Sequence, residues 1–187
     1  MQAIRLVRKH ADRFGFDPAK IGIMGFSAGA ELAAPAALFY KRFDAENGAK
    51  DPLSAVSSRP DFVTLVYPGP TPFARGETAD IPADAPPTFV ASPGAGDRVH
   101  AMWGTEFFAA MLQAGVPNVE IHIYASGFHP GTNAATAGIT HRNGIPFGTW
   151  QERHSEWRAD LGFLGKPGVE TKAAADVRTA VEGRRRR

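Results

Sequence analysis

Ser27 lies at the centre of residues 25–29 (GFSAG), which fit the pattern Gly-x-Ser-x-Gly. An apolar segment, residues 21–26, precedes the serine, and small and apolar residues follow it from 28 to 40. A serine on a sharp turn between a strand and a helix is held with its hydroxyl above the sheet, and the neighbouring glycines permit that turn. The N–H of Ala28, the first amide of the helix, would then face a developing oxyanion. The motif therefore predicts a nucleophilic serine.

Two other roles compete for this motif. A phosphate-binding turn is disfavoured, because the glycines do not form Gly-x-Gly-x-x-Gly and no Gly-Lys-Ser/Thr follows. Ser27 could also be an ordinary helix N-cap, which is the common role of a serine before a helix. The strand before the motif and the helix after it favour the nucleophile.

An acid and a histidine should follow the serine along the chain, in that order. Asp97 comes just after a predicted strand at 88–91, where side chains line the carboxyl edge of an open parallel sheet. Its alternative role is the N-cap of the next helix. Asp61 and Asp84 precede their strands, so we expect them at the opposite edge as turn or capping residues. Asp97 is the predicted acid.

His129 is the predicted base, because it follows a strand at 119–124 directly, in a loop flanked by glycines. His100 lies one turn from Asp97 and could cap the helix or touch substrate. His141 is the alternative base. The other histidines are expected outside the site: His10 and His154 facing solvent on the first and last helices, and His122 within a strand.

Metal and cofactor chemistry finds no support in the residue pattern. The chain has no cysteine, which excludes a thiolate zinc cluster, an iron–sulfur site and a cysteine nucleophile. No His-Glu-x-x-His or similar ligand spacing occurs. We therefore predict a site with no metal and no cofactor.

The predicted elements alternate between strands and helices, which indicates an α/β fold with a mainly parallel sheet flanked by helices. A first amphipathic helix presents Ile4, Val7, Ala11 and Phe14 on one face and carries Arg5 among its polar residues. The predicted strands are 21–26, 62–67, 88–91 and 119–124, and the later helices are 28–40, 101–114 and 150–164. Residues 44–60 are polar and loop-like. One domain, residues 1–167, contains all these elements.

Residues 168–187 form a basic tail in this interpretation. Of the 21 basic and 19 acidic residues in the chain, six and three lie in the tail, which leaves 15 basic and 16 acidic residues before it. The basic character thus belongs to the tail, expected to be solvated and poorly ordered. Nucleic-acid binding is not expected. Neither is a membrane partner, because no apolar segment approaches about 18 residues. The start MQAIRLVRKH lacks the apolar core of a signal peptide, so the expected location is cytoplasmic.

Residues 17–29, 96–100 and 127–129, together with the closing helix at 148–164, resemble α/β-hydrolase-fold serine esterases. That group contains acetyl xylan esterases, dienelactone-hydrolase-like proteins and carboxylesterases. The resemblance implies an α/β-hydrolase sheet and a serine esterase that cleaves short-acyl or acetylated-carbohydrate esters, or polyesters. Ser27, His129 and Asp97 would form its triad, with Ala28 in the oxyanion hole. The alternatives are a prolyl-oligopeptidase-type peptidase and a non-catalytic, oligomerising remnant of an esterase.

The sequence departs from that family at its beginning, where no early strands and no His-Gly-Gly loop are recognisable. We therefore expect a form of the fold that lacks its N-terminal strands and its usual second oxyanion donor. Residues 67–69, residues 94–96 or a neighbouring subunit could supply that donor. The strand at 21–26 would be a bare sheet edge, which predicts a homodimer or higher oligomer through the strand near Ile21. Aromatic side chains expected to contact substrate are Phe26, Tyr67 and Phe128, with Trp103 nearby.

Overall fold

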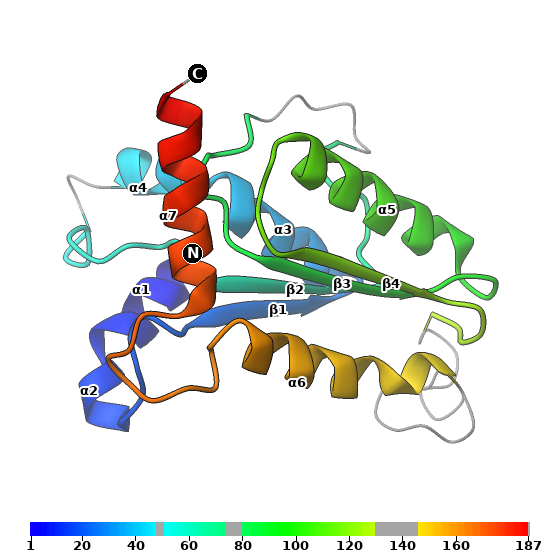
Figure 1. Cartoon of the computed structure of the whole chain (residues 1–187). Coiled ribbons are helices and arrows are strands. Elements are labelled where there is room, and N and C mark those ends of the chain that lie inside the picture. The colour runs from blue at the N-terminus through cyan, green and yellow to red at the C-terminus, as the bar shows by residue number, and fades with distance from the viewer. Residues whose placement is uncertain (48–50, 74–79, 130–145, 187) are drawn as a thin grey trace.

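A four-stranded parallel sheet forms the centre of the computed structural model, which describes residues 1–47, 51–73, 80–129 and 146–186 (Figure 1). The strands lie side by side in chain order: β1 (Gly22–Phe26), β2 (Phe62–Val66), β3 (Thr88–Pro93) and β4 (Val119–Tyr124). Each neighbouring pair is parallel, with Gly22 opposite Phe62 and Thr88 opposite Val119. The predicted strands and α/β class are confirmed, with strand ends moved by at most two residues.

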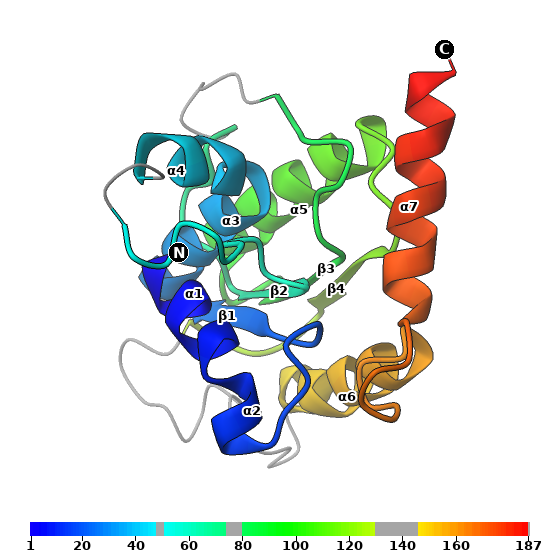
Figure 2. The same ribbon diagram turned by 90° about the vertical axis from the view of Figure 1, so that its left-hand side faces the viewer.

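Helices cover both faces of this sheet, as Figure 2 shows along the strands. The helices are α1 (Gln2–Lys9), α2 (Ala11–Phe14), α3 (Ala28–Leu38), α4 (Tyr40–Asn47), α5 (Arg98–Gln113), α6 (Trp150–Asp160) and α7 (Lys172–Arg185), and a 3-10 turn, η1 (Pro146–Thr149), precedes α6. Helices α3 and α5 pack on one face and α6 on the other. In the described part of the chain no helix is long and apolar enough to cross a bilayer.

The core consists of two apolar layers, one on each face of the sheet. Successive side chains of a strand point to opposite faces. Val90 therefore joins the layer under α3 and α5, while its neighbours Phe89 and Ala91 join the layer over α6. All three side chains have no exposed surface. Because both faces are buried, these strands read as continuous apolar runs rather than alternating ones.

Two helices lie where the sequence indicated irregular chain. Helix α4 occupies residues expected to begin a polar loop. Helix α7 occupies the segment expected to be a poorly ordered basic tail. Ala173 and Val177, one turn apart on α7, are 2% and 8% exposed, and Ala173 joins the α6 layer of the core. The Thr171 hydroxyl caps α7 by accepting from Ala174 N–H at 3.0 Å. Ala173 and Val177 form a narrow apolar stripe on α7, and the charged residues around them made this stripe difficult to recognise in the sequence.

The first amphipathic helix is divided at His10 into α1 and α2, and its buried face differs from the predicted one. Ile4 and Ala11 are buried as expected, but Val7 and Phe14 are exposed. Arg5, expected on the polar face, is fully buried and pairs with Asp44 at 2.7 Å and with Asp51 at 2.5 Å. These two carboxylates replace the water that the guanidinium loses, so a buried charge is tolerated.

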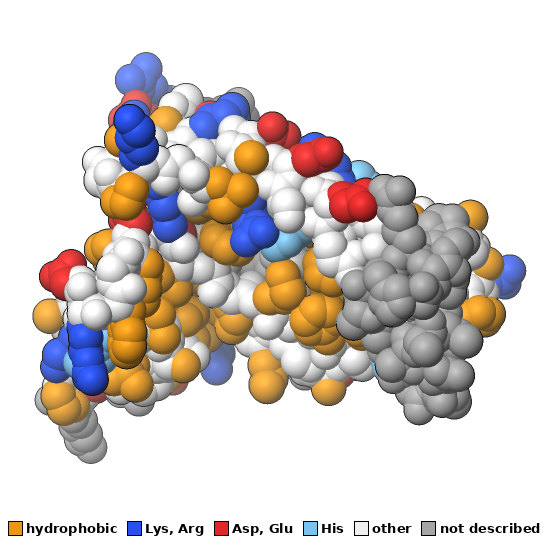
Figure 3. Space-filling model, turned by 90° about the horizontal axis from the view of Figure 1, so that it is seen from below, with side chains coloured by type: hydrophobic (Ala, Val, Ile, Leu, Met, Phe, Trp, Pro, Cys, Tyr) orange, Lys and Arg blue, Asp and Glu red, His pale blue; other side chains and the backbone are white. Residues whose placement is uncertain are grey.

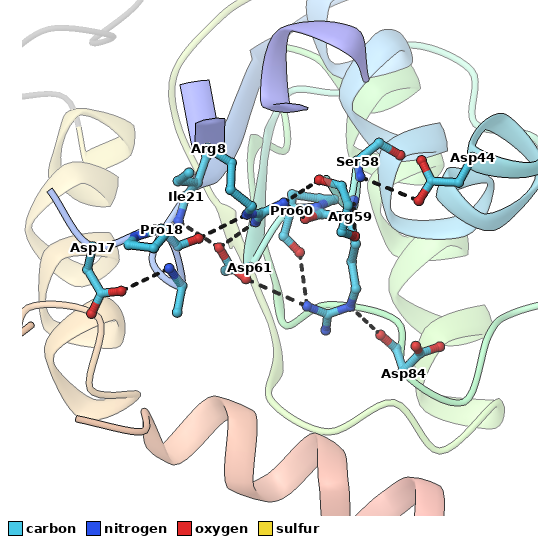
Figure 4. Close-up of polar contacts among 12 residues, drawn as sticks. Arg8, Asp17, Pro18, Ile21, Asp44, Ser58, Arg59, Pro60, Asp61 and Asp84 are labelled. Carbon is cyan, nitrogen blue, oxygen red and sulfur yellow. Dashed lines mark hydrogen bonds and ion pairs between the residues drawn. The ribbon is translucent and has the colours of Figure 1, made fainter. Parts of the chain in front are cut away.

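Polar contacts at the amino edge of the sheet fix α1 against the strands (Figure 4). Arg8 donates hydrogen bonds to three backbone carbonyls and to the Asp61 carboxylate, which also accepts from Ile21 N–H at 2.8 Å. Asp61 thus lies at the opposite edge from the predicted site, as expected. A cavity of about 370 Å³ opens beside Arg8 and Arg59. Arg8 and Arg59 already donate hydrogen bonds to backbone carbonyl oxygens, so we interpret these contacts as stabilising the fold and not as a binding site.

His154 on α6 is buried, which corrects the expectation that it faces solvent. It is 4% exposed, its Nε2 lies 2.9 Å from Thr64 Oγ1, and its ring packs between Phe89 and Trp157. The sequence of α6 is mostly polar, so the stripe of Trp150, His154 and Trp157 that faces the sheet gave a weak signal. Burial lowers the pKa of His154 to about 4.

This buried imidazole should make stability fall with acid. In the unfolded chain His154 takes up a proton near pH 6.5, whereas in the folded chain it does so only near pH 4. Its contribution is therefore fully present above pH 6.5 and is lost as the pH falls toward 4. The loss reaches about 2 kcal/mol by pH 5. The free energy of unfolding, measured with urea at pH 7.5 and 5.0, should differ between the two pH values by about 2 kcal/mol less in His154→Phe than in wild type. In the control His10→Phe the difference should equal that of wild type. Equal pH dependence in wild type and His154→Phe would contradict this prediction.

Candidate active site

Ser27 stands on a strained turn between β1 and α3. Its backbone has φ 51° and ψ −122°, a conformation that non-glycine residues adopt rarely and at a cost. Gly25 permits the turn, because a Cβ there would lie 2.2 Å from the Gly29 carbonyl oxygen. Gly29 differs from our expectation: a Cβ at that position would meet no described atom within 4 Å. Steric exclusion thus explains the first glycine of the motif and not the second.

His129 lies beside the serine at the carboxyl edge of the sheet. Its Nε2 is 2.7 Å from Ser27 Oγ, although 102 positions separate the two residues. The loops after β3 and β4 approach each other through a parallel bridge between Gly96 and Phe128. A Cβ on Gly96 would lie 2.0 Å from the Gly127 carbonyl oxygen, so this close approach requires glycine. The bridge brings the acid-bearing loop and the histidine-bearing loop together.

Asp97 is directed to a partner that we did not predict. Its Oδ1 accepts a hydrogen bond from His100 Nδ1 at 2.6 Å, whereas the expected partner was His129. The Asp97 side chain is 8% exposed, and its Oδ2 is buried with no hydrogen-bond partner among the described residues. Asp97 occupies the N-cap position of α5, yet its side chain makes no capping hydrogen bond. The spacing of three residues at a helix start could have indicated the bond to His100.

Aromatic rings enclose the His129 imidazole on two sides. The His100 ring stacks on it with centroids 4.3 Å apart and 20° between the planes, and Tyr67 approaches at 5.1 Å and 71°. Burial and then the neighbouring His100 lower the pKa of His129, while the negative charge of Asp97 opposes them. The lowered pKa keeps this imidazole neutral near pH 7, the form that can accept a proton from a hydroxyl.

The aromatic residues expected to contact substrate fall into two groups. Phe26 and Phe128 are 39% and 59% exposed, so both can meet a ligand. Tyr67 is only 2% exposed, has a positive φ of 37°, and burial raises its pKa to about 12. In this structure it supports His129 from within the core and does not line an open surface. Trp103 packs edge-on against His100, with centroids 5.1 Å apart.

Ala28 begins α3, so its N–H has no partner within the helix, and its role as an oxyanion donor stays a prediction. The segment 67–69 supplies no second donor here, because its amides are already used. Tyr67 N–H donates to Ala91 at 2.7 Å, Pro68 has no N–H, and Gly69 N–H donates to the Ser27 carbonyl at 3.4 Å. In segment 94–96, Gly94 N–H donates to Tyr124 at 2.7 Å. The remaining candidates of that segment are Ala95 and Gly96.

The other histidines are away from this site or outside the described residues. His122 bonds Glu120 at 2.7 Å on β4, and His141 lies outside the described residues. Asp97, His100 and His129 each have a ligand-type atom within 4.8 Å of the others. However, the lone pairs of stacked imidazoles lie in nearly parallel ring planes and do not converge on one ion. The arrangement suits proton transfer better than metal binding.

Comparisons with known proteins identify similar sequences and folds. Residues 1–80 match the family model BD-FAE. The structure of an acetyl ester-xyloside bifunctional hydrolase from Caldicellulosiruptor lactoaceticus is 27% identical, with a TM-score of 0.68 over 87% of this chain. The chain has the fold of an α/β hydrolase. A carboxylesterase from Lactobacillus plantarum shares this fold at 19% identity, with a TM-score of 0.65 over 88% of this chain and 66% of its own.

Two further proteins are similar to this chain. A thermophilic esterase from Thermogutta terrifontis, with butyrate bound, has a TM-score of 0.64 at 23% identity over 89% of this chain and 65% of its own. Endo-1,4-beta-xylanase B from Butyrivibrio fibrisolvens is 37% identical over 67 residues, which are 36% of this chain and 10% of that protein. The chain also spans only 64% of the acetyl ester-xyloside hydrolase. The similarity to the solved structures thus covers most of this chain but only part of each of those proteins.

Proposed function

We propose that this chain is a carboxylic ester hydrolase that acts through an acyl-enzyme. The observation that carries the proposal is the 2.7 Å contact between Ser27 Oγ and His129 Nε2 on a strained strand-to-helix turn. Hydroxyl and base already lie at hydrogen-bond distance, as nucleophilic catalysis requires. The solved esterases of the same fold support it further.

In the proposed mechanism Ser27 Oγ attacks the ester carbonyl while its proton passes to His129 Nε2. The Ala28 N–H stabilises the oxyanion. The bond to the leaving oxygen then breaks, and His129 returns the proton to the departing alcohol. Water, activated by the same imidazole, cleaves the acyl-enzyme and regenerates the serine. Asp97 stabilises the imidazolium that forms in each half of the cycle.

The proposed substrates are esters with a short acyl group, including acetylated carbohydrates and polyesters. Phe26 and Phe128 flank the serine region and are 39% and 59% exposed, which favours an open acyl site over a deep tunnel. One relative is named as an acetyl ester-xyloside hydrolase, and another holds butyrate. An open site accommodates a bulky alcohol portion such as a sugar chain.

The first test is hydrolysis of p-nitrophenyl acetate and butyrate together with covalent labelling. The purified chain should hydrolyse both esters, and a fluorophosphonate probe should attach one group to the peptide that contains Ser27 and stop hydrolysis. Ser126→Ala is the matched control, because Ser126 is an exposed serine in the His129 loop; it should label and hydrolyse as wild type does. Absence of both labelling and hydrolysis would favour the non-catalytic remnant.

We further propose that β1 is the interface of a homodimer or higher homo-oligomer. In the described part of the chain β1 pairs with β2 only, which leaves its other edge open. Met24 on β1 is 41% exposed. Hydrophobic side chains also gather in several groups on the face that carries α6 (Figure 3). An open apolar strand edge is a template for pairing with another chain.

Light scattering tests this assembly. At micromolar concentration the 187-residue chain should have at least twice its monomer mass of 20.0 kDa. Met24→Lys places a charge on the strand edge and should shift the protein toward monomer. A wild-type monomer at the same concentration would contradict the proposal.

A further inference from the structure

His100 connects the predicted acid and the predicted base. Its Nδ1 donates to Asp97 Oδ1 at 2.6 Å, and its ring stacks on His129 at 4.3 Å with 20° between planes. Trp103 closes the outer side of His100 edge-on, at 5.1 Å and 87°. The side chain of His100 is 19% exposed, and that of Asp97 is 8% exposed. His100 is therefore held by three contacts at once, and two of them are to the predicted catalytic residues.

The hydrogen bond to His100 determines which oxygen of Asp97 is available. Oδ1 is occupied by His100 Nδ1, while Oδ2 is buried and has no hydrogen-bond partner among the described residues. His129 uses Nε2 for Ser27, so its Nδ1 is the ring atom left to meet an acid. An atom of Asp97 and one of His129 already lie within 4.8 Å. A buried carboxylate oxygen without a donor is costly, and the nearby imidazole can supply one.

We propose that His100 is a positioning residue for the Asp97–His129 pair, holding the carboxylate by its Oδ1 and the His129 ring by stacking. This inference rests on the proposed ester hydrolysis and adds a fourth residue to it. His100 fixes the rotation of the carboxylate, so that Oδ2 is the acceptor for His129 Nδ1–H when substrate binds. The stack, together with the edge contact of Tyr67, fixes the ring plane of His129. A catalytic hydrogen bond that is long in the free enzyme commonly tightens in the substrate complex.

Three other roles for His100 each explain fewer of its contacts than the positioning role does. These roles are helix capping, metal binding and contact with substrate. A helix-capping role does not explain the stack, and the Asp97 side chain makes no capping bond to α5. A shared metal ion would need converging nitrogens, which the stacked rings do not offer. A role in contacting substrate alone does not explain why His100 Nδ1 bonds to the buried Asp97 carboxylate.

Three variants test the role of His100. His100→Ala removes both the hydrogen bond and the stack. His100→Asn places an amide donor as many bonds from the backbone as Nδ1, so it restores the bond to Asp97 without the ring. His122→Ala is the matched control, because His122 also contacts a carboxylate, Glu120, at 2.7 Å, but on β4 away from the serine.

Kinetics give the first readout. His100→Ala should lower kcat for p-nitrophenyl acetate by about 10- to 100-fold, the usual effect of losing a hydrogen bond to a charged group, with KM nearly unchanged. His100→Asn should recover a large part of that loss, and His122→Ala should behave as wild type does. A loss in His100→Ala that Asn does not restore would overturn the role in holding Asp97.

Imidazole titration followed by NMR gives a second readout that needs no catalysis. Asp97 and His100, at the start of α5, are the titratable groups that act on His129, whose ring also contacts Ser27 and Tyr67. Without the His100 ring, the midpoint of the His129 titration should move to higher pH, and the acid limb of the rate profile should move with it. An unchanged midpoint in His100→Ala overturns the proposal. If the wild type lacks esterase activity but the midpoint moves, the ester hydrolase proposal fails and the positioning of His129 stands.

Discussion

Replacing Ser27 with alanine should lower kcat for p-nitrophenyl acetate by about 10⁴- to 10⁶-fold, the range seen when other serine hydrolases lose their nucleophile. The reason is specific to this geometry. Ser27 Oγ is the atom that lies 2.7 Å from His129 Nε2, and alanine leaves the imidazole with no hydroxyl to activate. Remaining turnover would reflect binding and oxyanion stabilisation alone.

The measurement is steady-state hydrolysis, with circular dichroism to show that the fold is retained. Ser126→Ala, which removes an exposed serine from the His129 loop, should keep full activity. Retention of more than a tenth of wild-type activity by Ser27→Ala would show that a different residue is the nucleophile.

Glycine at position 27 extends this test to stability. Ser27 has φ 51°, a backbone conformation that costs a non-glycine residue about 1–3 kcal/mol. Ser27→Gly should therefore be as inactive as Ser27→Ala, but more stable than it by about 1 kcal/mol in urea unfolding. If Ser27→Gly is inactive and more stable than Ser27→Ala, the backbone at position 27 is strained, and the strain is the cost of holding the serine hydroxyl in place. Equal stability of the two variants would remove the argument for strain.

Replacing Asp97 with asparagine should lower kcat by about 10⁴-fold, as the corresponding change does in a well-studied serine protease. An amide carries no negative charge to stabilise the imidazolium, and its N–H can enforce the wrong tautomer of the histidine. Asp97 is the residue whose charge raises the pKa of His129, against burial and His100, which lower it. In Asp97→Asn the His129 pKa should therefore fall further.

Measuring kcat across a range of pH distinguishes this loss of kcat in Asp97→Asn from a general loss of folding or stability. Asp160→Asn is the matched control, because Asp160 is a carboxylate at the end of α6 with a side chain 65% exposed; it should leave kcat unchanged. The unfolding midpoint of Asp97→Asn should be measured as well, since the variant also alters the bond to His100. A kcat loss below about 10-fold would show that Asp97 is not the acid, contrary to our assignment.

Local chemistry explains why the strands were predictable. The apolar runs that became β2 and β3 are bounded by proline and glycine, and both faces of each strand are buried, so the signal was continuous and strong. Ser27, Asp97 and His129 were chosen because each lies soon after a predicted strand, in the order serine, acid, histidine that this type of fold uses. Parallel strands place such residues at one edge without further information.

Partners across the site were not predictable in the same way. Asp97 bonds to His100, three positions away, and not to His129, 32 positions away, and the rotation of one carboxylate decides between these partners. The buried state of His154 depends on which face of α6 meets the sheet. Helix α7 was hidden because its two buried residues stand among charges. For His154 and α7 the deciding contacts join residues distant in the chain, on a helix face that composition does not reveal.

The sequence by itself determined the α/β class, the strand order along the chain and the serine motif, since apolar runs and turn residues act over a few neighbouring positions. The tertiary structure alone decided that His129 meets Ser27 at 2.7 Å, that Asp97 pairs with His100, and that Tyr67 supports the base from the core. These relations depend on ångström-scale packing between loops, and such packing follows from the whole fold.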